Sequence, residues 1–174
     1  MVLLEPSFPV KRLQYILRDA DTQIMIYSPV FQDKCTSMIN EIVTLTPDNV
    51  TQTDCDAWTP PPVTPQDPMY IAFTSRSTDA PKGVVIEHGM VYSMLQAHKD
   101  VVGASIASRG LIFASPAFDI CLAEVTFMLD TGGCVCVPSE TQRTNSLAKA
   151  MTTMRVNMAV RRQNLVLKRT KIFR

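Results

Sequence analysis

Hydroxyl and lysine side chains follow one another between residues 70 and 83, directly after a short apolar run. The apolar run occupies positions 70–73, and the segment ends in Pro81-Lys82-Gly83. Hydroxyl groups and the backbone N–H groups of a turn donate hydrogen bonds to phosphate oxygens, and a lysine ammonium adds a mobile positive charge. The segment therefore predicts a cradle for a polyphosphate. Its candidate nucleotide-binding residues are Thr74, Ser75, Ser77, Thr78, Lys82 and Gly83.

The order of residues in this cradle differs from that of the Walker phosphate loop. In the Walker loop, Gly-Lys comes after four spacer residues and is followed by Ser or Thr. Here Lys82 precedes Gly83, and a second apolar run at 84–86 comes next. We therefore expect a strand, a loop and a second strand.

The same segment resembles the phosphate-binding loop of the AMP-forming adenylating enzymes. This superfamily includes acyl-CoA ligases, luciferases and the adenylation domains of nonribosomal peptide synthetases. Its pattern reads Thr-Ser-Gly-Ser-Thr-Gly, one free residue, then Pro-Lys-Gly, and the chain departs from it only at Arg76 and Asp79, which stand where the family has Gly. The resemblance implies ATP and Mg²⁺ as cofactors and an amino acid as the substrate.

The two replaced glycines bear on nucleotide affinity. Glycine reaches positive φ at no steric cost and lets a ligand approach the backbone. Asp tolerates the left-handed region better than most residues. The carboxylate of Asp79 would nevertheless face phosphate, at a cost of about 1 kcal/mol in water and about 4 kcal/mol near a protein surface. The guanidinium of Arg76 can pair with a phosphate, although its bulk would fill the cradle, so we expect weakened ATP binding.

The likeness to this family extends from about residue 3 to Ala159. The matching segments are 5–16, 118–119, 132–140 and 155–157. The first resembles the Asp-Pro-Ser-His-Pro segment and Arg-Leu helix of peptide synthetase adenylation domains, and the later ones resemble fungal members. The resemblance implies a three-layer α/β fold with a mostly parallel sheet, as part of the large N-terminal lobe of the adenylate-forming enzymes. We therefore assign residues 1–159 to a partial adenylation domain.

Asp119 admits a functional and a structural interpretation. In the family, the Asp of the corresponding Phe-Asp pair lines the acyl pocket and holds the α-amino group of an amino acid through a charge-assisted contact. Structurally, an Asp directly before the apolar helix expected at 120–129 is an N-cap, which contributes about 1 kcal/mol. Cys121 stands where the family commonly has Ser. Asp119 is thus the candidate substrate-binding residue, and no catalytic residue is assigned.

The elements that must position these residues alternate between strand and helix. Such alternation predicts an α/β core with a mostly parallel sheet, independently of the resemblance. We expect helices at 9–20, 31–39, 89–102, 119–129 and 145–154, and strands at 23–27, 41–45, 69–74, 83–87, 109–114 and 133–137. Segment 46–68 is rich in proline, which removes hydrogen-bond donors and restricts the preceding residue, so it predicts a surface loop.

The composition excludes several classes of protein. With 174 residues, 46% apolar and 19% charged, the chain is expected to form one globular domain. No window approaches the roughly 18 apolar residues of a membrane helix, and the N-terminus lacks a signal-peptide layout, so we expect no membrane partner and a cytoplasmic location. An odd number of cysteines, 5, favours reduced thiols. Since only His88 and His98 accompany them, we expect no metal site of the chain's own.

Residues 160–174 form a basic tail without a family counterpart. Residues 141–174 carry Lys and Arg but no Asp or Glu, whereas acidic side chains outnumber basic ones before this point. A basic segment can bind nucleic acid electrostatically. The tail offers no aromatic platform beyond Phe173 and no recognisable reader fold. We therefore expect a solvated tail rather than a nucleic-acid site.

Three family segments that complete the active site have no match in residues 1–174. They are Tyr-Gly-Pro-Thr-Glu, which contacts adenine and metal, Thr-Gly-Asp, which holds the ribose, and a lysine on a C-terminal lobe. Because phosphoryl chemistry depends on bringing such groups together, we expect a fragment of an amino-acid-adenylating synthetase domain, inactive by itself, with other synthetase domains as partners. The alternatives are a noncatalytic nucleotide-binding or protein-interaction remnant and a basic-tailed nucleic-acid binder.

Overall fold

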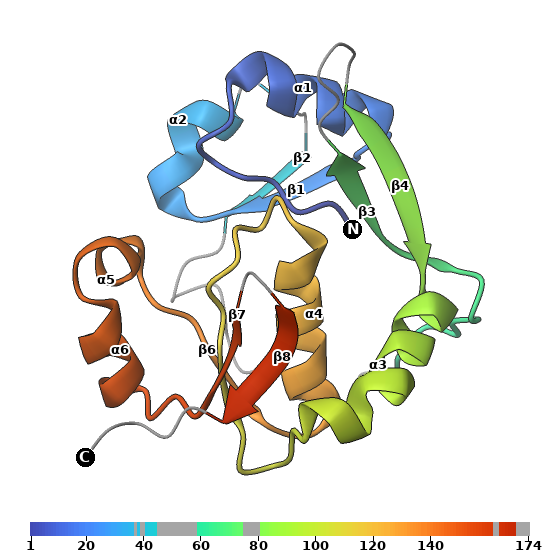
Figure 1. The fold of residues 1–174 in the computed structure, drawn as a ribbon. Helices are drawn as coiled ribbons and strands as arrows, with labels where there is room; N and C mark the ends of the chain where they lie inside the picture. Colours follow the sequence, from blue (N-terminus) through green and yellow to red (C-terminus); the bar gives the residue numbers. More distant parts are fainter. Residues whose placement is uncertain (37, 39–40, 45–58, 75–80, 162–163, 170–174) are drawn as a thin grey trace. The chain divides into compact units, whose positions relative to one another are not determined.

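The chain divides into two units, Met1–Glu87 and His88–Arg174, and each is described by itself. The computed structural model describes residues 1–36, 38, 41–44, 59–74, 81–161 and 164–169 (Figure 1). Within these ranges, no helix is long and apolar enough to cross a bilayer.

Helix α1 (Val10–Asp19) supplies buried apolar side chains to the first unit. Leu13, Ile16 and Leu17 recur at helical spacing and are buried. Pro9 precedes the helix, where its missing N–H breaks no helical hydrogen bond. The helix predicted at 9–20 is therefore confirmed.

A parallel strand pair follows α1 in the first unit. Strand β1 (Ile24–Tyr27) pairs in parallel with β2 (Glu41–Thr44), and η1 (Pro29–Phe31) and α2 (Gln32–Cys35) lie between them in sequence. The helix predicted at 31–39 is wrong in its extent, because Phe31 closes a tight turn in which its N–H donates to the carbonyl of Ser28 at 2.9 Å. Helix α2 then ends at Cys35, and residues 37, 39 and 40 lie outside the described residues.

Strands β3 (Pro68–Thr74) and β4 (Lys82–Glu87) form an antiparallel hairpin. Its register pairs Tyr70 with Ile86 and Thr74 with Lys82, so the loop between the strands begins directly after Thr74. Both predicted strands are confirmed, whereas loop residues 75–80 lie outside the described residues. In the proline-rich segment, residues 59–67 contain no helix or strand, and residues 45–58 lie outside the described residues.

A sheet of strand order β6-β5-β7-β8 organises the second unit. Strand β5 (Arg109–Leu111) pairs in parallel with β6 (Cys134–Cys136) and with β7 (Met158–Arg161), while β8 (Asn164–Arg169) is antiparallel to β7. No strand is predicted at 158–161 or 164–169, so β7 and β8 are findings of the structure. Strand β8 lies within residues 160–174, for which a solvated tail is expected from the sequence. The helices of this unit are α3 (His88–Val102), α4 (Asp119–Asp130), α5 (Glu140–Asn145) and α6 (Leu147–Thr153).

Helices cover both faces of this sheet. A Cβ on Gly110 would lie 2.5 Å from Sδ of Met128, so Gly110 faces α4. Neighbouring residues of a strand point to opposite faces, and Leu111 packs in a cluster with Leu147 and Met151 of α6. The second unit therefore has the helix, sheet and helix layers that the sequence predicts.

Helix α5 is absent from the sequence prediction. Ser139 is its N-cap: its Oγ accepts a hydrogen bond from the N–H of Gln142 at 3.2 Å, and Oε1 of Gln142 accepts from the N–H of Ser139 at 2.8 Å. This capping box was readable from the Ser-x-x-Gln spacing. The helix predicted at 145–154 begins only at Leu147, because Ser146 has an extended φ of −152°.

The core of the second unit makes a direct stability prediction. Val156 is 0% exposed and clusters with Leu111 and Cys136. Val156→Ala should lower the free energy of unfolding by about 2 kcal/mol, because it removes buried methyl groups and leaves a cavity. Urea unfolding followed by circular dichroism measures this change. The matched control is Val101→Ala, at a side chain that is 71% exposed, which should change it by no more than about 0.5 kcal/mol. Equal effects would contradict the assigned core.

Candidate functional site

The loop end of the β3–β4 hairpin places two candidate nucleotide-binding residues opposite each other. Thr74 and Lys82 form a cross-strand pair, and Oγ1 of Thr74 donates to the Lys82 carbonyl at 3.3 Å. Both side chains are exposed. A hydroxyl and an ammonium side by side at a turn fit phosphate oxygens. The remaining loop residues, Ser75, Arg76, Ser77, Thr78 and Asp79, lie outside the described residues.

Gly83 has a packing reason to lack a side chain. A Cβ at this position would lie 3.0 Å from Cγ2 of Ile71 and 3.2 Å from Cζ of Phe73. The glycine therefore lets β4 lie against two apolar side chains of β3. Its role in binding nucleotide stays a prediction, separate from this packing.

Asp119 lies beyond the carboxyl end of β5, where ligands of parallel α/β sheets commonly bind. It is the first residue of α4 and is exposed. Phe118 occupies the N-cap position with an extended backbone (φ −110°, ψ 139°), and no side chain caps the helix. The structural interpretation of Asp119 as an N-cap is therefore wrong. Its carboxylate lies in the first helical turn, where the helix dipole favours a negative charge.

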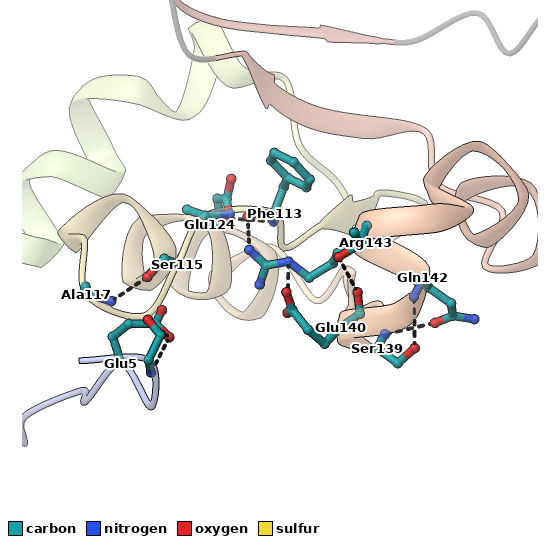
Figure 2. Close-up of polar contacts among 12 residues, drawn as sticks. Glu5, Phe113, Ser115, Ala117, Glu124, Ser139, Glu140, Gln142 and Arg143 are labelled. Atoms are coloured by element: carbon teal, nitrogen blue, oxygen red, sulfur yellow. Dashed lines mark hydrogen bonds and ion pairs between the residues drawn. The ribbon is translucent and has the colours of Figure 1, made fainter. Parts of the chain in front are cut away.

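The segment between β5 and α4 is held by a side chain rather than by strand pairing. Oε2 of Glu124 accepts hydrogen bonds from the backbone N–H groups of Phe113 at 3.2 Å and Ala114 at 3.3 Å. Figure 2 shows Glu124 beside Phe113. The strand predicted at 109–114 ends at Leu111. The N–H of Ile112 still donates to the carbonyl of Cys136, and the two N–H groups after it donate to this carboxylate.

A compact turn carries the chain from this contact to Asp119. The N–H of Ala117 donates to Oγ of Ser115 at 3.2 Å, and the N–H of Phe118 donates to the carbonyl of Ser115 at 3.0 Å. The N–H of Cys121 then donates to the carbonyl of Phe118 at 3.1 Å. Successive hydrogen bonds therefore connect the end of β5 with the start of α4.

Arg143 of α5 contacts the same segment (Figure 2). Its Nη2 donates to the carbonyl of Phe113 at 2.9 Å, and its Cζ lies 5.5 Å from the centroid of the Phe113 ring. Its Nε also lies 3.8 Å from Oε2 of Glu140, whose side chain is 85% exposed. An exposed ion pair of this kind contributes little, so the contacts to Phe113 are the structural role of Arg143.

Glu124 is buried, with 7% of the residue exposed. Burial raises its pKa above the ordinary value, while the N–H groups of Ala114 and Phe113 and the guanidinium of Arg143 oppose the rise. Burial also raises the pKa of the Cys121 thiol, Glu124 adds to that rise, and Arg143 opposes it. Ionised Glu124 therefore carries a desolvation cost that its partners only partly offset.

Glu124 and Arg143 are absent from the candidates drawn from the sequence. The sequence did contain a signal for Glu124. It is the single acidic residue in the apolar run 120–129, and an acidic side chain that is buried is almost always paired. No comparable signal pointed to Arg143, whose partner Phe113 is 30 residues away.

The described residues could contact a nucleotide phosphate, but they do not form a metal-binding cluster. In these parts of the chain, no group of three or more His, Cys, Asp or Glu side chains could hold a metal ion. Magnesium that accompanies ATP is bound largely by phosphate oxygens and waters, so Thr74 and Lys82 can serve the nucleotide without such a cage. Cys35, Cys121, Cys134 and Cys136 are free thiols.

Known proteins resemble the chain in sequence and in fold. A family model described as AMP-binding enzyme matches residues 1–160. The nonribosomal peptide synthase roqA of Penicillium rubens is 70% identical over 160 residues, which make up 92% of this chain and 7% of that protein. VinN in complex with 3-methylaspartate has a TM-score of 0.72 at 19% identity, over 91% of this chain and 44% of that chain. The synthetase FmoA3 bound to alpha-methyl-L-serine-AMP has a TM-score of 0.70 at 24% identity, over 87% and 17%.

The solved structures and the sequence relative support different conclusions. The two solved structures confirm the predicted α/β fold of the adenylate-forming enzymes. The chain spans only 7% of the length of the synthase roqA.

The raised pKa of Glu124 predicts a pH-dependent stability. A folded-state pKa above the ordinary 4.5 means that the folded chain binds this proton more tightly than the unfolded chain. The free energy of unfolding should therefore fall as the pH rises from about 4.5 through the raised pKa, and then level off. Glu124→Gln removes this contribution, so urea unfolding of both proteins should show a wild-type advantage that declines as the pH rises.

Glu140→Gln is the matched control, because it removes an exposed carboxylate that also faces Arg143. It should follow the pH profile of the wild type. A constant difference between wild type and Glu124→Gln across this pH range would show that burial does not shift the pKa of Glu124.

Proposed function

Because the chain belongs to the AMP-binding enzyme family, we propose that residues 1–160 form part of an amino-acid-adenylating domain of a nonribosomal peptide synthetase. The reaction of such a domain joins ATP and an amino acid into aminoacyl-AMP and releases pyrophosphate. The observation that carries the proposal is the 70% identity to the synthase roqA over 160 residues. The exposed pair Thr74 and Lys82 at the hairpin end supports it, because this pair suits a phosphate.

In this proposal the hairpin binds the phosphates of ATP. Lys82 contributes an ammonium charge, while the loop residues Ser75, Ser77 and Thr78 contribute hydroxyl donors. The hydroxyl of Thr74 would turn from the Lys82 carbonyl to donate to phosphate. Bound Mg²⁺ would neutralise part of the phosphate charge. Asp79 opposes binding, because its carboxylate is repelled by phosphate.

The proposed substrate is an amino acid whose α-amino group binds the carboxylate of Asp119. An ammonium and a carboxylate form a charge-assisted contact, and the exposed Asp119 lies beyond the end of a parallel strand. The FmoA3 structure was solved with an aminoacyl-AMP, which supports an amino-acid substrate for this fold. We further propose a cytoplasmic location and other synthetase domains as partners.

The purified 174-residue polypeptide should be inactive. Its residues include none of the three further family segments that hold adenine, ribose and the developing charge. We expect no amino-acid-dependent exchange of labelled pyrophosphate into ATP above the enzyme-free blank, with an intact adenylation domain as the positive control. Exchange by this polypeptide would contradict the predicted inactivity.

Salt-sensitive DNA binding that is lost on deletion of residues 160–174 would favour the alternative of a nucleic-acid binder.

Restoring the family glycines should strengthen nucleotide binding. The double variant Arg76→Gly, Asp79→Gly removes a repelled carboxylate and a bulky side chain, so we expect ATP affinity to rise by about 1 to 4 kcal/mol, roughly fivefold to nearly a thousandfold. Calorimetric titration of ATP with Mg²⁺ at fixed salt measures this change. Catalysis should remain absent.

Two further variants test whether the hairpin is the ATP-binding site. Lys82→Met should weaken ATP binding in the double variant, because the ammonium charge is lost. Lys99→Met removes an exposed lysine of α3, outside the hairpin, and should leave ATP binding unchanged. Unchanged or weaker binding in the double glycine variant would show that Arg76 compensates for Asp79 or that the loop does not meet the nucleotide.

A further inference from the structure

We propose that Glu124 is a positioning residue whose carboxylate sets the path of segment 113–118 and thereby the place of Asp119. The proposal rests on the proposed function only for the substrate-binding role of Asp119. The geometry of the segment itself stands on contacts within the second unit.

Glu124 closes a loop that contains Asp119. Both residues belong to α4, and the carboxylate of Glu124 binds the backbone N–H groups of Phe113 and Ala114, which come before the helix. The start of α4 therefore cannot shift relative to the end of β5 without breaking two hydrogen bonds to a charged group. Such hydrogen bonds are stronger than neutral ones.

Phe113 is bound at both of its backbone polar groups. Its N–H donates to Glu124, and its carbonyl accepts from Arg143. The preceding residue, Ile112, still belongs to the sheet, since its N–H donates to the carbonyl of Cys136 at 2.9 Å. Side-chain control of the backbone thus begins where sheet pairing ends.

Stability alone does not explain a carboxylate at this position. The helix face around Glu124 is apolar, with Cys121, Phe127 and Met128 all buried. Replacing a buried ionic group by a well-packed apolar side chain is often neutral or stabilising. Among the described residues, the Arg143 guanidinium favours the ionised form of Glu124, and Glu124 in turn raises the pKa of the Cys121 thiol. What the side-chain oxygen of Glu124 supplies, and an apolar side chain cannot, is an acceptor for two backbone N–H groups.

Amide hydrogen exchange of the full chain, followed by NMR, tests this role without a ligand. In Glu124→Leu, the amides of Phe113 and Ala114 should exchange about tenfold to a hundredfold faster, because a hydrogen bond to a charged group is lost. The acceleration should extend to Ala117 and Phe118 in the turn. The reference amides of Cys134 and Val156, bound within the core, should keep their wild-type rates.

Two variants separate positioning from general stability. Glu124→Gln keeps an oxygen acceptor and should retain most of the protection, within about threefold of the wild type, whereas Glu140→Gln should have no effect. Acceleration confined to Phe113 and Ala114, or equal acceleration at the reference amides, would overturn the proposal. If Glu124→Leu does not fold, Glu124→Met decides: the four segment amides should exchange faster than in the wild type while the reference amides keep their rates, and unchanged segment amides would overturn the proposal.

A ligand titration distinguishes failure of this proposal from failure of the proposed function. L-amino acids, added one at a time, should shift the amide signal of Asp119 in the wild type and in Glu124→Gln. In Glu124→Leu, about tenfold more amino acid should be needed for the same shift. The matching 2-hydroxy acid, which lacks the amine, should cause no shift. If no amino acid shifts the wild-type signal, the substrate role of Asp119 fails, while the exchange rates still decide whether Glu124 sets the path of the segment.

Discussion

The hydrogen bonds from Phe113 and Ala114 to the buried carboxylate of Glu124 are the constraint on which the second unit's site depends. They follow the last sheet hydrogen bond, made by the N–H of Ile112, and hold the chain that leads toward α4. Since Glu124 lies on the helix that Asp119 begins, one side chain connects the strand end with the candidate substrate carboxylate. The position of this candidate carboxylate therefore depends on the local closure.

Both candidate binding sites lie where a strand ends. Thr74 and Lys82 lie at the loop end of the β3–β4 hairpin, and Asp119 lies after β5. Strand ends leave backbone and side-chain polar groups exposed, on a scaffold that sheet pairing keeps rigid. In the hairpin this rigidity depends on Gly83, which lets β4 pack against Ile71 and Phe73. The chemistry of each place thus comes from polar loop residues, and its geometry comes from apolar packing beside it.

Local patterns in the sequence predicted α1, the β3–β4 hairpin and α4, but they missed α5, β7 and β8 and could not predict long-range contacts. The helical spacing of Leu13, Ile16 and Leu17 predicted α1, and apolar runs flanking a polar loop predicted the hairpin. The N-cap of α4 was misplaced by one residue, because a favourable side chain at Asp119 does not force the cap position that Phe118 takes.

The partners of Glu124 lie 10 and 11 residues before it, and the partner of Arg143 lies 30 residues before it. Neither separation follows from the period of a helix or a strand. The most direct measurement is an NMR titration of the ¹³C-labelled Glu124 carboxyl together with the ¹⁵N amides of Phe113 and Ala114. We predict a carboxyl midpoint above the ordinary 4.5, followed by both amide signals with the same midpoint. A midpoint at or below 4.5, or amide signals that do not follow the carboxyl, would contradict the account.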